Sequence, residues 1–137
     1  MKTKPVLCSA DVDALLVGAR AEAAANQWAV TIAVADDGGH LLGLCRLDGA
    51  SPMTAAMAPE KARTAALGRR ESKVYEEIIN QGRTAFLSAP LLGMLEGGVP
   101  IVVEGQVVGA VGVSGVKSDQ DAQIARAGIT AWQAGLP

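Results

Sequence analysis

Residues 95–115 combine valine runs with repeated glycines, in the sequence LEGGVPIVVEGQVVGAVGVSG. Glycine weakens a strand interior, because it has no side chain to pack and loses more backbone freedom on folding than any other residue. The valine pattern still predicts a hairpin, with strands at 99–103 and 106–114 and a turn at Glu104-Gly105. The glycines then indicate either a phosphate-gripping loop or a sheet that a neighbour approaches closely.

The spacing of these glycines decides between the two explanations. A P-loop requires glycine directly before its lysine and again five positions earlier, where this chain has Val116 and Val111. Gly109 and Gly112 are three residues apart on the strand, so they face opposite sides of the sheet and favour close packing on both. Gly97-Gly98 lies at a loop-to-strand junction, where backbone N–H groups can face an anion, so we expect ligand contact there.

The rest of the chain predicts one α+β domain over residues 1–137. Apolar periodicity and turn residues indicate a helix, a hairpin, two helices, a second hairpin and a last helix, in the order α-β-β-α-α-β-β-α. The two hairpins are expected to form one antiparallel sheet flanked by helices. The expected ranges outside 99–114 are helices at about 10–27, 51–70 and 73–80, strands at 29–35 and 40–47, an irregular segment at 83–95, and a helix from 118.

Local signals refine these helices. Ser9 and Ser118 are suited to cap the first and last helices. Pro59 is expected to kink or split the second helix, because proline removes a backbone hydrogen bond and clashes with the preceding turn.

Composition narrows the possible functions. Half of the residues are hydrophobic but only 3% are aromatic, so a core of small aliphatic side chains is expected. The net charge of -2 and the lack of a basic run argue against nucleic acid as a partner. A single histidine and two distant cysteines cannot assemble a zinc-finger ligand set. No run is long enough to cross a membrane and no signal-peptide core is evident, so we expect a cytoplasmic protein.

Four charged or titratable side chains are candidates for a site. His40 is the one side chain whose ordinary pKa lies near neutrality, although a solvated turn residue is the more ordinary role for it. Lys61 lies among small apolar residues and could hold a carboxylate, or could pack its stem and extend its ammonium to water. Arg46 and Asp119 are weaker candidates, since solvent exposure and helix capping also explain them.

Four segments, in order and spacing, resemble the GlcG/HbpS-like family, which includes the C-terminal domain of PduO-type adenosyltransferases. These segments are IAVADDGGHLLGLCRLDGA, EKARTAA, the glycine-rich stretch quoted above, and SDQDAQIARAG. The resemblance implies a profilin-like fold of antiparallel strands flanked by helices, and assembly into dimers or octamers. It also implies that haem is a possible cofactor. The residues themselves predict no metal site held by the protein alone.

Three functions follow from these observations. The first is a pocket for haem, a related tetrapyrrole or a small carboxylate-bearing molecule, with a possible accessory role in glycolate or diol catabolism. In it, Lys61 and the Gly97-Gly98 amides would hold anionic groups, Glu96 would make polar contact, and His40 would be a possible haem ligand. The second is an enzyme acting on a small carboxylated metabolite through Lys61 and Glu96. The third is a structural accessory subunit.

Overall fold

The computed structural model describes residues 1–137 and contains the expected succession of helices and strands, with one additional short helix. The elements are α1 (Ser9–Ala25), β1 (Thr31–Asp36), β2 (Leu41–Arg46), α2 (Pro52–Gly68), α3 (Lys73–Asn80), the 3-10 helix η1 (Thr84–Ser88), β3 (Gly98–Val103), β4 (Gln106–Ser114) and α4 (Ser118–Ala134).

Both hairpins join one four-stranded sheet, in the strand order β2-β1-β4-β3. Every neighbouring pair is antiparallel, and the two hairpins meet where β1 pairs with β4. Glu104 and Gly105 turn the second hairpin with φ angles of 52° and 75°, the left-handed conformation that a two-residue turn requires. The predicted fold class and element order are therefore confirmed.

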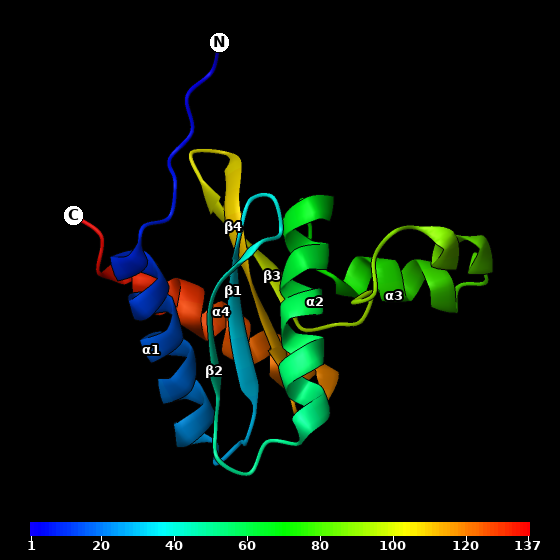
Figure 1. The fold of residues 1–137 in the computed structure, drawn as a ribbon, viewed down its shortest axis with the longest axis horizontal. Coiled ribbons are helices and arrows are strands. Elements are labelled where there is room, and N and C mark those ends of the chain that lie inside the picture. Colours follow the sequence, from blue (N-terminus) through cyan, green and yellow to red (C-terminus); the bar gives the residue numbers. More distant parts are fainter.

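The helices cover the two faces of this sheet unequally. Helices α1 and α4 lie on one face and α2 on the other, while α3 projects from the body beside α2 (Figure 1). Branched side chains and Trp132 fill the face under α1 and α4. The face under α2 is built from alanines, so α2 lies close to the strands.

Gly112 and Gly109 explain the glycine pattern of β4. A Cβ on Gly112 would lie 2.2 Å from the carbonyl oxygen of Ala58 in α2. A Cβ on Gly109 would lie 2.4 Å from the carbonyl oxygen of Ala35 and 2.7 Å from Leu7. The expectation that these glycines admit close neighbours is confirmed.

Three local predictions differ from the structure. Helix α2 runs from Pro52 to Gly68 without interruption, so Pro59 does not split it. Ser9 and Ser118 are the first residues of α1 and α4, and the capping positions belong to Cys8 and Lys117. Asp11 instead caps the N-terminus of α1, because its carboxylate accepts the backbone N–H of Cys8 at 2.8 Å.

None of the helices combines the length and the apolar character needed to span a bilayer.

Candidate functional site

A buried ion pair joins α2 to the start of α4. The Nζ of Lys61 donates to Asp121 Oδ2 at 3.0 Å and to the carbonyl oxygen of Val113 at 3.1 Å. The two side chains are only 5% and 3% exposed. The ammonium is therefore already engaged within the chain and is not presented to solvent.

The second oxygen of Asp121 is also used. Asp121 Oδ1 accepts the backbone N–H of Val116 at 3.1 Å, so the carboxylate ties the end of β4 to α4 as well as to α2. Burial raises the pKa of Asp121 above its ordinary value, and the positive charge of Lys61 opposes that rise. The negative charge of half-buried Glu96 adds to the rise, which places Glu96 near the pair.

The glycine pair Gly97-Gly98 packs directly on this lysine. A Cβ on Gly97 would lie 2.9 Å from Lys61 Cδ, and a Cβ on Gly98 would lie 2.1 Å from the Lys61 carbonyl oxygen. The Gly98 N–H donates to Ser72 Oγ at 2.8 Å, and the Gly97 carbonyl accepts the Val113 N–H at 3.0 Å. The structure therefore brings Lys61, Gly97 and Gly98 together, as close packing at a junction of α2, β3 and β4.

The remaining candidates lie elsewhere. His40 is in the β1–β2 turn with a side chain 78% exposed, and its Nδ1 is 3.2 Å from the Asp36 carboxylate. Arg46 ends β2, about 20 Å from His40 at the rise of a strand, and its guanidinium donates to the Ala50 carbonyl oxygen at 2.9 Å. Asp119 is exposed in the first turn of α4.

The seven candidates do not share one pocket. None of the four pockets of the molecule is lined by His40, Arg46, Lys61, Glu96, Gly97, Gly98 or Asp119. No group of three or more His, Cys, Asp or Glu side chains is placed to hold a metal ion either. A direct role of these residues in ligand binding stays a prediction.

The raised pKa of Asp121 gives a pH dependence that can be measured. Between its ordinary value of 3.8 and its raised value, the folded protein keeps a proton that the unfolded chain has released. The stability that Asp121 contributes is therefore expected to fall as pH rises through this window. The free energy of unfolding of the wild type minus that of Asp121→Asn should decrease from about pH 4 upward. An increase over the same range, in urea titrations at each pH, would contradict this assignment.

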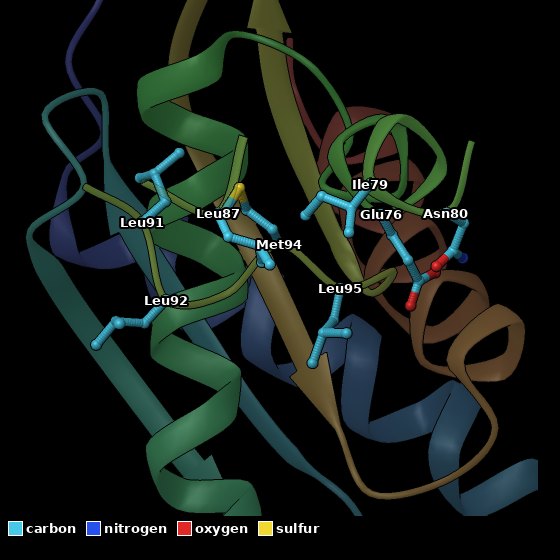
Figure 2. Close-up of a pocket in the computed structure, with 8 residues that line it drawn as sticks. All are labelled: Glu76, Ile79, Asn80, Leu87, Leu91, Leu92, Met94 and Leu95. Atoms are coloured by element: carbon cyan, nitrogen blue, oxygen red, sulfur yellow. The ribbon is translucent and has the colours of Figure 1, made fainter. Parts of the chain in front are cut away.

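One of the four pockets is an apolar groove between α3 and the segment after η1. It has a volume of about 430 Å³ and is mostly hydrophobic (Figure 2). Ile79, Glu76 and Asn80 come from α3 on one side, and Leu91 and Leu92 lie across from them. The full lining, called the α3 groove below, consists of Glu76, Ile79, Asn80, Leu87, Leu91, Leu92, Met94 and Leu95.

Aromatic contacts hold the α3 side of this groove in place. Tyr75 of α3 stacks on Phe86 of η1, with ring centres 5.3 Å apart. A Cβ on Gly68 would lie 1.9 Å from the Tyr75 hydroxyl, so Tyr75 also rests on the end of α2. The α3 groove is therefore bounded by elements that are anchored to one another and to the body of the fold.

Residue patterns did not reveal the α3 groove. Its lining comes largely from the segment RTAFLSAPLLGML, residues 83–95, which was expected only to be irregular. One signal was present, because this short irregular segment carries five large apolar aliphatic or thioether side chains. Leu87 and Leu92 are 62% and 80% exposed in the structure.

Comparison with known proteins identifies close relatives. Residues 7–130 match the family model described as haem degrading protein HbpS-like. The chain is 60% identical to Protein GlcG of Escherichia coli strain K12 over 114 residues, covering 83% of this chain and 85% of that protein.

Solved structures share the fold. HbpS matches with a TM-score of 0.85 at 30% identity, over 95% of this chain and 92% of HbpS. ORFY of Klebsiella pneumoniae matches with a TM-score of 0.88 at 24% identity, over 100% and 98% of the two chains. A complex of PduOC with haem matches with a TM-score of 0.83 at 24% identity, over 93% and 95%.

Proposed function

Because this chain belongs to the HbpS-like family of haem-degrading proteins, we propose that it binds haem or a related tetrapyrrole, and that the α3 groove is the binding site. The observation that carries the proposal is the groove itself, an apolar pocket of about 430 Å³. The candidate residues predicted from the sequence line no pocket. That volume lies within the range of about 300–1,000 Å³ that is usual for small-molecule sites.

The groove residues suit the apolar ring system of a tetrapyrrole. Six of the eight lining residues are hydrophobic and can cover an apolar ring system. Met94 supplies a thioether, a ligand type that haem iron accepts in other proteins. Haem, when bound, would supply an iron centre with redox potential set by such surroundings. Glu76 is the only ionisable side chain of the lining, so acidic groups of the ligand are expected to point away from it.

Two sequence-based alternatives are less favoured by the geometry. An enzyme that used Lys61 as an electrophile or base would need its side-chain nitrogen exposed to the substrate, whereas this ammonium is buried against Asp121. A structural accessory role is compatible with the buried Lys61–Asp121 ion pair. The expected assembly into dimers or octamers is compatible with it too. The free edge of β2 carries three partly exposed leucines, a surface that a second copy can cover, and oligomerisation stays a prediction.

Titration with haem tests the proposed function. The wild type should develop a sharpened, shifted Soret band that saturates with a defined stoichiometry. Leu92→Glu should weaken binding about tenfold, because it removes apolar contact and places a carboxylate at the groove. Leu92 is 80% exposed, so the fold should tolerate the change.

A matched substitution distinguishes haem binding at the α3 groove from non-specific hydrophobic binding. Leu41→Glu places the same charge on a leucine that is 53% exposed on β2 and does not line the groove. It should leave haem affinity unchanged. A wild type without a saturable Soret change, or equal losses in both variants, would contradict the proposed function.

A further inference from the structure

Strand β2 has a neighbouring strand on one side only, because it lies at the edge of the sheet (Figure 1). The N–H of Leu47, just after β2, donates to the Val30 carbonyl oxygen at 2.9 Å. Residues of an antiparallel strand alternate in the side to which their backbone groups bond, so those of Leu44 and Arg46 point away from β1. No backbone group elsewhere in the chain bonds to them. The outer edge of β2 therefore offers unpaired N–H and C=O groups to another strand.

The opposite edge of the sheet, formed by β3, is protected. The Gly97 carbonyl oxygen accepts the Val113 N–H at 3.0 Å. By the same alternation, the backbone groups of Gly98 and Pro100 point outward from β3. The Gly98 N–H donates to Ser72 Oγ at 2.8 Å, and the Gly98 carbonyl oxygen accepts the Ser72 N–H at 3.0 Å. Pro100 has no N–H to donate. Of the two edges, β2 is therefore the one that is open to strand addition.

The side chains of β2 are self-complementary about Leu44. A second, antiparallel copy of β2 centred on this residue sets the two Leu44 side chains against each other, and sets Leu42 against the apolar stem of Arg46. Leu42 and Leu44 are 43% and 39% exposed in the single chain, so this pairing removes apolar surface from water. The part of β2 that pairs regularly with β1, Gly43 to Arg46, includes this centre.

The charges at the two ends of β2 are opposite in sign. Arg46 ends the strand, and its guanidinium donates to the Ala50 carbonyl oxygen without pairing with a carboxylate. The turn before β2 carries Asp36 and Asp37. Two-fold antiparallel pairing directs Arg46 of each copy toward this turn of the other, so the charges attract at both ends of the contact. A second copy of the chain thus matches β2 in backbone bonding, apolar surface and charge.

We propose that β2 pairs with β2 of a second copy across a two-fold axis at Leu44, which joins the two sheets into one continuous sheet. This inference goes beyond haem binding and does not depend on it, because no residue of β2 lines the α3 groove.

A single cysteine tests the pairing, because a residue on a two-fold axis faces its own copy. With Cys8 and Cys45 replaced by serine, Leu44→Cys should form an inter-chain disulfide under mild oxidation by copper phenanthroline. The Cα atoms of a hydrogen-bonded antiparallel pair lie about 5.5 Å apart, which suits a disulfide. Leu42→Cys has similar exposure in the same strand but faces the partner's Arg46, so it should stay unlinked in non-reducing electrophoresis.

Sedimentation measures the assembly itself. The wild type should sediment as a dimer or a multiple of it. Leu44→Glu opposes two carboxylates on the axis and should lower the mass of the particle to half or less. Val17→Glu introduces the same charge on α1, at a side chain that is 65% exposed, and should leave the mass unchanged. Circular dichroism can verify that both variants are folded.

Several results would overturn the pairing. These are a wild type that is monomeric at micromolar concentration, a Leu44→Glu protein with the wild-type mass, and a Leu44→Cys protein that links no better than Leu42→Cys. Haem titration of Leu44→Glu should match that of the wild type. A failure of the pairing is therefore distinguishable from a failure of the proposed haem site.

Discussion

Replacing Lys61 with methionine is expected to destabilise the folded protein by about 3–5 kcal/mol, the cost of leaving one member of a buried ion pair without its partner. The Asp121 carboxylate is 3% exposed and would lose its only cationic partner. Methionine resembles lysine in length, so most of the loss would come from the charge and not from a cavity. Urea denaturation at neutral pH measures this change directly.

A double variant tests whether the unpaired charge of Asp121 causes this loss of stability. Lys61→Met combined with Asp121→Leu removes both charges and should recover much of the lost stability, since apolar pairs often replace buried ion pairs at little cost. Lys73→Met on α3, which has no salt bridge, should change stability little. A Lys61→Met protein as stable as the wild type, but with impaired ligand binding, would show that Lys61 serves a ligand and not the fold.

Gly112→Ala should be nearly as damaging, with an expected loss of about 3 kcal/mol, the upper end of the usual cost of overpacking. The new methyl group would lie 2.2 Å from the Ala58 carbonyl oxygen and 2.4 Å from the Ala62 backbone nitrogen. Both atoms belong to the backbone of α2, so no side-chain rotation can relieve the clash. The helix would have to move away from the sheet.

A second glycine serves as the control for this prediction. Gly105 has a φ of 75°, and a Cβ added to it would meet no neighbour within 4 Å, so Gly105→Asn keeps both the turn and the packing. The unfolding midpoint in urea should fall strongly for Gly112→Ala and little for Gly105→Asn. Equal midpoints for the two variants would mean that α2 does not lie as close to β4 as described.

Local signals predicted most of the fold. The first hairpin followed from the turn residues 36–39 and the second from its valines and the turn at Glu104-Gly105. The structure places all four strands within two residues of the expected ranges. The spacing of Gly109 and Gly112 correctly indicated close approach on both faces of the sheet. It could not indicate which helix approached Gly112, because that depends on how α2 crosses the sheet.

The same local signals could not predict which residues distant in the sequence contact one another. Lys61 was recognised as a cation among apolar neighbours, but its partner Asp121 is 60 residues away and was not among the candidate site residues. The α3 groove was missed for a related reason. Its two walls come from α3 and from an irregular segment, and no periodicity specifies how an irregular segment packs.

The most direct test of the account is to locate bound haem by the nuclear magnetic resonance spectrum of methyl-labelled protein. Ferric haem is paramagnetic and broadens the signals of nearby methyl groups. We predict selective broadening of Ile79, Leu91 and Leu95, with Leu41 and Leu42 of β2 unaffected. Broadening centred on Leu41 and Leu42, next to His40, or spread evenly over the protein, would contradict the assignment of haem to the α3 groove.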